Sequence, residues 1–151
     1  MRIIIVRHGE TKENHQGILQ GHSHGTLSKT GKQQVKKVAL RLQKEKIDIA
    51  YLSDLGRVVD TAQAILKYHP NTKVFYSKDL REQDHGVFTG VHKSKFHEAR
   101  QRVSFRRFRP KGGESFMQVR QRVRGFYTKL VSKHHKKTIL IVSHGAVILI
   151  T

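Results

Sequence analysis

His8 is the first residue whose type and neighbours could do chemistry. It stands between Arg7 and Gly9, and only Arg7 separates it from a run of apolar residues. A neutral imidazole is a nucleophile near neutral pH, an arginine binds phosphate oxygens, and a glycine permits close approach of the backbone. The adjacent cation also disfavours the protonated ring. These residues predict attack on phosphorus by His8, although an isolated Arg-His-Gly is equally typical of a polar strand end.

Three further side chains have the types that this chemistry needs. Arg57 is expected on the first turn of a helix, where its guanidinium and the unpaired backbone amides both attract phosphate. His144 precedes Gly145 and repeats the pattern of His8. Glu82 is a loop carboxyl that could protonate a departing oxygen. Taken singly, Arg57 and Glu82 are more typical of solvated surface residues, so their meaning comes from the combination.

The hydrophobic pattern predicts the elements that must position these side chains. Strands are expected at 2–6, 47–52, 73–76 and 138–142, and helices at 28–42, 55–68 and 114–135. The uninterrupted apolar runs 2–6 and 138–142 are typical of strands buried on both faces. This order indicates an α/β three-layer sandwich with a largely parallel central sheet flanked by helices. Ligands of such sheets bind outside the carboxyl ends of the strands, where the four candidate side chains are expected.

The segment 85–111 shows no regular period and is rich in Lys and Arg. Phe96, Phe105 and Phe108 lie among these cations. They match nucleic-acid stacking platforms only loosely. We therefore expect them to pack the segment onto the rest of the domain.

Length and composition restrict the class of protein. A chain of 151 residues has the size of one domain, expected here over 1–151 with a single core. The net charge of +19 indicates an anionic partner, which could be a phosphorylated substrate, an acidic membrane or a nucleic acid. The absence of cysteine excludes disulfides, thiol nucleophiles and cysteine-ligated metals. No apolar run reaches the roughly 18 residues of a membrane span, and we expect a cytoplasmic protein.

The histidines do not predict a metal site. His134 and His135 are adjacent on an expected helix, so their side chains do not share a face, and neighbouring lysines would repel a cation. A solvated helix end is the expected role of this pair. The other histidines show no ligand spacing with carboxylates. We therefore expect neither a metal nor a cofactor.

These motifs together resemble the histidine phosphatase superfamily, also called phosphoglycerate-mutase-like. They occur in the family's order and cover nearly the whole chain, which makes the resemblance highly specific. The residues that carry it are Arg7 to Thr11 with Asn14, Gln20-Gly21, Ser53 and Arg57 to Ala62, Leu80-Arg81-Glu82 with Gly86 and Gly90, Gly112 to Ser115, and Ser143-His144-Gly145.

The resemblance implies a role for each candidate residue. His8 would be the nucleophile that becomes phosphohistidine. Arg7, Arg57 and His144 would bind the transferring phosphoryl group, and Glu82 would be the proton donor. Substrate contacts are implied for Asn14, Gln20 and Gly21.

Two features depart from the family pattern. Asp54 stands where members often have proline, and it brings a negative charge close to an anion pocket; its side chain is expected to point away and cap the helix that carries Arg57. Few residues follow His144, so the chain is expected to lack the last helix and strand of the family, with Ala146 to Ile150 starting that helix. An exposed sheet edge and a homodimer would be consistent with such a shortened end.

Three functions remain open at this stage. The resemblance favours a metal-independent phosphatase acting on a small phosphorylated metabolite through His8. A phosphoglycerate mutase with the same intermediate is the alternative, but the short segment between Glu82 and Glu114 favours an open site with water as acceptor. The third is a basic nucleic-acid-binding protein without catalysis, whose binding would be non-specific and weaken steeply with salt.

Overall fold

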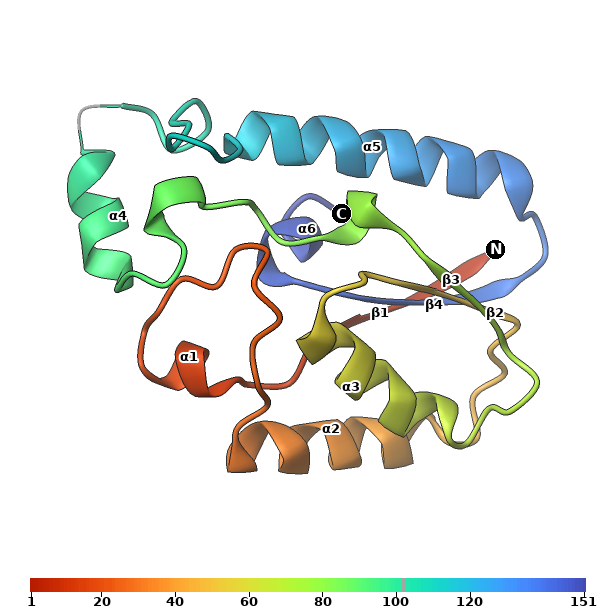
Figure 1. The fold of residues 1–151 in the computed structure, drawn as a ribbon. Coiled ribbons are helices and arrows are strands. Elements are labelled where there is room, and N and C mark those ends of the chain that lie inside the picture. Colours follow the sequence, from red (N-terminus) through yellow and green to blue (C-terminus); the bar gives the residue numbers. More distant parts are fainter. Residues whose placement is uncertain (102) are drawn as a thin grey trace.

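The computed structural model describes residues 1–101 and 103–151, which form layers around one parallel sheet (Figure 1). The strands are β1 (Arg2–Arg7), β2 (Ile49–Leu52), β3 (Lys73–Tyr76) and β4 (Thr138–Ser143). They lie in the order β1-β4-β2-β3, and every neighbouring pair is parallel. The predicted fold class is confirmed.

Helices cover both faces of this sheet. The helices α2 (Lys29–Leu42) and α3 (Gly56–Leu66) pack on one face, and α5 (Phe116–Lys133) and α6 (Gly145–Ile148) pack on the other (Figure 1). The remaining helices are short and lie in the connections: α1 (Lys12–His15), η1 (Lys78–Leu80), η2 (Gly86–Phe88) and α4 (Lys93–Ala99). Sequence periodicity did not predict these short helices, because one or two turns are too few to establish a period.

The central strand β4 separates two apolar cores, one on each face of the sheet, whereas a single core was expected from the chain length. Leu140 and Val142 face the core beneath α2 and α3, whereas Ile139 and Ile141 face the core beneath α5. All four side chains are fully buried, as expected for a parallel strand that is covered on both faces. This buried strand ends at Ser143, so the packing of β4 on both faces sets the place of Ser143 and of His144, the next residue.

The prediction that the first strand is buried on both faces was wrong. β1 lies at the edge of the sheet and pairs with β4 alone among the described strands. Ile5 is 37% exposed, because it lies in a surface hollow beside Val123 and Tyr127, where α5 covers this face only in part. An apolar, β-branched run suits a central and an edge strand alike, because the residue pattern does not encode how many neighbouring strands pair with it.

The basic segment is anchored by aromatic packing. Phe96 on α4 is buried and makes edge-to-face contacts with His85, Phe88 and Phe108. Phe105 lies against Phe116 at the beginning of α5. Phe105 thus packs the segment onto α5, as expected, whereas the aromatic contacts of Phe96 and Phe108 lie within residues 85–111 and hold the segment together. Arg102, which the sequence places in this basic segment, lies outside the described residues.

No helix in the described ranges combines the length and the apolar character that a membrane span requires.

Candidate active site

Two histidines emerge side by side from the paired strands β1 and β4. The register pairs Arg7 with Ser143, so the next residue of each strand is a histidine. The backbone N–H of His8 donates to the carbonyl of Ser143 over 3.0 Å. The two rings lie 5.2 Å apart between centroids. The predicted meeting of His8 and His144 at one edge of the sheet is therefore present.

His8 is held in one tautomer. Its ring is buried, and Nδ1 lies 2.7 Å from the carbonyl oxygen of Gly9, which can only accept. Nδ1 therefore carries the proton, and Nε2 keeps its lone pair. Arg57 donates its Nε–H to that lone pair from 3.3 Å. Burial, opposed by the Gly9 hydrogen bond and assisted by Arg57 and Arg7, lowers the pKa of His8 to about 4.

Arg57 is a buried cation on the first turn of α3. Its side chain is 1% exposed, and its terminal nitrogens donate to the carbonyls of Ser23 and Gly21. Burial lowers its pKa to about 10, although Glu82 and Glu13 act in the opposite direction. The guanidinium remains charged at neutral pH. Its Nε–H reaches His8, so the cation lies directly beside the candidate nucleophile.

Gln20 and Gly21 lie around Arg57. Gly21 accepts a hydrogen bond from the guanidinium, and Gln20 is buried with its Oε1 unpaired among the described residues. Gly25 has a positive φ of 69°, and a Cβ at that position would lie against the Gln20 side chain and Arg57. The segment from Gln20 to Gly25 thus wraps the arginine; substrate contacts by Gln20 and Gly21 stay a prediction.

His144 is fully buried and carries an unpaired nitrogen. Its Nε2 lies 2.8 Å from the Ser53 hydroxyl, while Nδ1 is buried without a partner in the described parts of the chain. Burial, with smaller contributions from Arg57 and His8, holds the pKa of His144 well below its ordinary value. A buried unpaired nitrogen is costly; in the tautomer with the proton on Nδ1, in which Nε2 accepts from the Ser53 hydroxyl, Nδ1 can donate to a phosphoryl oxygen bound beside His8.

Arg7 and Asn14 border the same cavity as His8. This cavity measures about 630 Å³ and extends from the end of β1 between α1 and α2. Arg7 is exposed, and its guanidinium lies against Gly145, at the point where β4 passes into α6. Asn14 Oδ1 accepts from the Thr11 backbone over 3.2 Å, so a phosphate contact would fall to its amide group.

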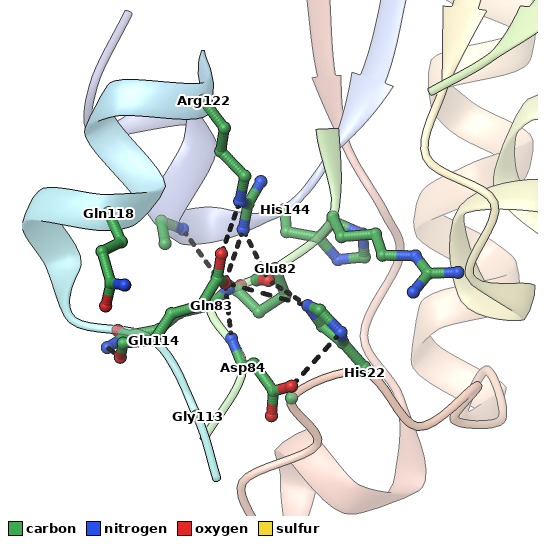
Figure 2. A network of polar contacts seen from close by, with 12 residues as sticks. His22, Glu82, Gln83, Asp84, Gly113, Glu114, Gln118, Arg122 and His144 are labelled. Atoms are coloured by element: carbon green, nitrogen blue, oxygen red, sulfur yellow. Dashed lines mark hydrogen bonds and ion pairs between the residues drawn. The ribbon is translucent and has the colours of Figure 1, made fainter. Parts of the chain in front are cut away.

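Glu82 presents its carboxyl group at the same edge of the sheet. Oε1 accepts backbone N–H bonds from Gln83 at 2.8 Å and from Ala146 at 3.2 Å. Ala146 follows Gly145, so Glu82 is bonded to the segment directly after His144 (Figure 2). The structure therefore brings the Glu82 carboxyl close to the chain segment that carries the second histidine.

The sequence did not reveal the polar network behind Glu82. Arg122 and Glu114 form a bidentate ion pair, and His22 and Arg122 both contact the main chain of Glu82 (Figure 2). One signal was present: Arg122 stands three residues after Val119 and four before Phe126, both of which are buried. A charged residue on the inward face of an amphipathic helix indicates a specific partner.

The prediction for Asp54 was wrong. Helix α3 begins after Leu55 and has no side-chain cap. Asp54 instead accepts two hydrogen bonds from Arg81, with Arg81 Nε 2.6 Å from Oδ1. These bonds from Arg81 lower the pKa of Asp54. A bidentate arginine outcompetes the helix amides, and it neutralises the negative charge close to the anion site.

Within residues 1–101 and 103–151, no group of three or more His, Asp and Glu side chains is arranged so that it could hold a metal ion. His135 is exposed, but the expectation of a solvated helix end fails for His134. Its ring nitrogen lies 2.9 Å from the Tyr51 hydroxyl, so it ties the end of α5 to the sheet.

This combination defines a class of protein: a parallel α/β fold with two buried neutral imidazoles, two arginines and a carboxyl group gathered at the strand ends. Comparison with known sequences then identifies the family. Residues 3–151 match the histidine phosphatase superfamily (branch 1), and the chain belongs to this family of phosphatases and mutase-like enzymes. The resemblance found from the motifs is confirmed.

Individual relatives agree with this assignment. The chain is 38% identical to phosphoglycerate mutase-like protein 4 of Arabidopsis thaliana, over 97% of this chain and 67% of that protein. It is 34% identical to phosphoserine phosphatase 1 of Hydrogenobacter thermophilus, over 95% of this chain and 71% of the relative. The α-ribazole phosphatase of Shigella flexneri superposes with a TM-score of 0.89 at 28% identity, over 98% of this chain and 76% of that structure.

Proposed function

We propose that this protein hydrolyses small phosphate monoesters through a phosphohistidine formed on His8. The observation that carries the proposal is the state of the His8 ring. Nδ1 is tied to the Gly9 carbonyl, Nε2 keeps its lone pair, and burial keeps the ring neutral at neutral pH. A neutral imidazole held in one tautomer beside a buried arginine is prepared to attack phosphorus.

In the first step, the lone pair of His8 Nε2 forms a bond to phosphorus. The bond between phosphorus and the ester oxygen breaks, and its electron pair goes to that oxygen. Glu82, in its protonated form, gives its proton to the oxygen, so that the alcohol leaves neutral and Glu82 becomes a carboxylate. Proton donation of this kind contributes roughly 10²- to 10⁴-fold to a rate.

In the second step, water attacks the phosphorus of phosphohistidine. One water proton passes to the Glu82 carboxylate, and the remaining hydroxyl bonds to phosphorus. The bond between phosphorus and Nε2 breaks, and its electron pair returns to the ring. Inorganic phosphate is released, and His8 and Glu82 regain their starting protonation states.

The transferring phosphoryl group needs positive charge around its oxygens, because the transition state is loose and its charge is spread. The guanidinium groups of Arg7 and Arg57 supply that charge, and His144 supplies a hydrogen-bond donor from a neutral ring. Arg57 and His144 are buried and already held by hydrogen bonds, so they need little reorganisation, whereas Arg7 is exposed and adds its charge beside the cavity that His8 borders. We therefore assign phosphoryl binding to Arg7, Arg57 and His144, with Asn14 as a further contact, and neither step of the proposed reaction needs a metal.

Two observations guide the choice of substrate and acceptor. The segment between Glu82 and Glu114 is shorter than the insertion expected of a mutase, which would enclose the substrate. A site that is only partly enclosed admits water, which would then accept the phosphoryl group. The relatives include one named a phosphoserine phosphatase and one named phosphoglycerate mutase-like. Phosphoserine is therefore the first metabolite to test, and transfer to a second hydroxyl of a phosphoglycerate is the alternative outcome.

The decisive experiment traps the intermediate. The purified protein is mixed with ³²P-labelled phosphoserine in the presence of EDTA and quenched in alkali, which preserves phosphohistidine. Acid-labile label on His8, together with phosphate release, is the expected result. His8→Ala should lose both the label and the hydrolysis of p-nitrophenyl phosphate, whereas His135→Ala, a change at an exposed position two residues beyond the end of α5, should retain both. Hydrolysis that persists in His8→Ala would remove the proposal.

A further inference from the structure

The Arg122 guanidinium donates its hydrogen bonds to Glu114 and to the main chain around Glu82. Nε and Nη2 donate to the two carboxylate oxygens of Glu114, over 2.9 and 3.0 Å. Nη1 donates to the carbonyl of Asp79 over 2.7 Å, and Nη2 donates to the carbonyl of Glu82 over 2.9 Å. One side chain on α5 therefore holds a main-chain carbonyl of η1, directly before the loop that carries Glu82, and the carbonyl of Glu82 within that loop (Figure 2).

Glu82 is held by hydrogen bonds both at its main-chain carbonyl and at its carboxyl group. Its carbonyl accepts from Arg122 and also from His22, whose Nε2 lies 2.9 Å away. Its carboxyl oxygen Oε1 accepts from the backbone of Gln83 and of Ala146. The loop between Leu80 and Gly86 has no helix or strand of its own, so these bonds take the place of regular structure in setting the direction of the side chain.

The two carboxyl oxygens of Glu82 are thereby made unequal. Oε1 faces two N–H donors, and a proton on Oε1 would have to displace at least one of them. No hydrogen bond to Oε2 occurs among the described residues. A protonated carboxyl group carries a single O–H, so that proton belongs on Oε2. Oε2 is then the oxygen that can donate to a substrate.

We propose that Arg122 is the positioning residue of this site: by gripping the Glu82 main chain it presents Oε2, the proton-bearing oxygen, to the departing ester oxygen. The inference rests on the proposed function, since it needs Glu82 to act as the acid. Arg122 touches no reacting atom, and its effect passes through Glu82. Misplacing a catalytic group by about 1 Å can cost roughly 10²-fold in rate.

The planar fork of arginine is required for this role. A guanidinium can hold a carboxylate with two parallel bonds and still reach two carbonyls, whereas an ammonium group is a point donor. Burial would raise the pKa of Glu114, but the bonds from Arg122 and the Asp84 backbone outweigh it and lower that pKa. Glu114 therefore stays charged and keeps the fork in place at neutral pH.

The test compares Arg122→Lys with Arg120→Lys, a matched change at an exposed position of the same helix. Each is assayed with phosphoserine, whose leaving oxygen needs a proton, and with p-nitrophenyl phosphate, whose leaving oxygen needs little. Arg122→Lys should lower kcat for phosphoserine by roughly 10- to 100-fold, with KM and the aryl phosphate rate changed far less. Arg120→Lys should resemble the wild type with both substrates.

A second comparison separates positioning from mere support of the fold. In a Glu82→Gln background the acid is already absent, so adding Arg122→Lys should cost nothing further with phosphoserine. An equal loss with both substrates, or a loss that persists in that background, would overturn the role of Arg122 while leaving the His8 chemistry intact. If Arg122→Lys does not fold by circular dichroism, Glu114→Gln, which weakens the same fork, must show the same substrate-dependent loss. Activity that does not depend on His8 would instead remove the proposed function itself.

Discussion

The rings of His8 and His144 lie 5.2 Å apart, although the two residues are separated by almost the whole chain. Parallel pairing of β1 with β4 produces this proximity, because Arg7 and Ser143 are in register. Both imidazoles are buried, and burial is the main cause that lowers both pKa values. The site therefore offers two neutral rings, and the positive charge for a phosphoryl group must come from arginines.

Replacement of Glu82 by Gln should separate substrates by their leaving group. The amide cannot donate the proton that an alkoxide needs, so we expect the rate with phosphoserine to fall by roughly 10²- to 10⁴-fold. With p-nitrophenyl phosphate the loss should be under about 10-fold, because phenolate leaves with little protonation. Steady-state kinetics of both substrates provide the measurement. Equal losses would mean that Glu82 only positions the substrate.

Acid should destabilise the folded protein through His8. Its pKa is about 4 when folded, against 6.5 in the unfolded chain, so the unfolded chain takes up the proton first as the pH falls. This contribution to stability is intact above pH 6.5 and is lost between pH 6.5 and about 4. Urea titrations measure the free energy of unfolding at about pH 7.5 and about pH 4.5. Between these two pH values, it should fall by about 2 kcal/mol less in His8→Asn than in the wild type.

The control for this pH effect is His135→Asn, because that histidine is exposed and should follow the wild type. His144 is also buried with a lowered pKa, so some pH dependence will survive in His8→Asn. Parallel stability curves for the wild type and His8→Asn would show that the folded ring takes up its proton near its ordinary pKa.

The ion pair between Asp54 and Arg81 should couple two loops of the site. Asp54 lies two residues before the first residue of the helix that carries Arg57, and Arg81 directly precedes Glu82. The geometry is bidentate, and both side chains are about a quarter exposed, at 28% for Asp54 and 25% for Arg81. A double-mutant cycle of Asp54→Asn and Arg81→Gln should give a coupling of about 1 kcal/mol in the free energy of unfolding.

High salt provides the second arm of this experiment. The coupling should shrink only modestly in about 1 M salt, because partly buried charges are screened less than exposed ones. The exposed pair of Lys95 and Glu98 is a suitable comparison, since its coupling should be close to zero already at low salt. A cycle that closes without coupling would mean that water competes successfully for both partners.

The proximity of His8, His144 and Arg57 could be predicted from the sequence, because each stands at a strand end or a helix start. His8 and His144 each follow an apolar run, and such runs mark buried strands whose carboxyl ends meet. Arg57 follows the next strand, on the first turn of a helix. Strand ends and helix starts are local properties, so residue order alone was sufficient to place these three side chains together.

Other parts of the site depend on contacts between distant segments. The grip of Arg122 on the Glu82 loop is set by how α5 lies across that loop, which no local pattern encodes. Asp54 had two available partners, and its choice of Arg81 over the helix amides follows from the position of another loop. The edge position of β1 is likewise a property of the assembled sheet.

Close packing behind His8 leads to the last prediction. Gly31 on α2 lies so close to the main chain of Glu10 that an added Cβ would collide with its carbonyl. Backbone cannot give way as a flexible side chain can, so Gly31→Ala should displace the loop from His8 to Glu10 or push α2 off the sheet. We expect a destabilisation of roughly 1–3 kcal/mol, as for other overpacked sites, and a fall in kcat/KM.

Gly125 on α5 supplies the matched control. An added Cβ there meets no described atom within 4 Å, and the position is exposed in the middle of a helix. Gly125→Ala should therefore raise the free energy of unfolding by about 0.5–1 kcal/mol, through the better helix propensity of alanine, and leave activity unchanged. Urea denaturation and p-nitrophenyl phosphate hydrolysis, run on both variants, measure the two effects. If Gly31→Ala were as benign as Gly125→Ala, the backbone of the His8 loop would not be packed against α2 in the way described.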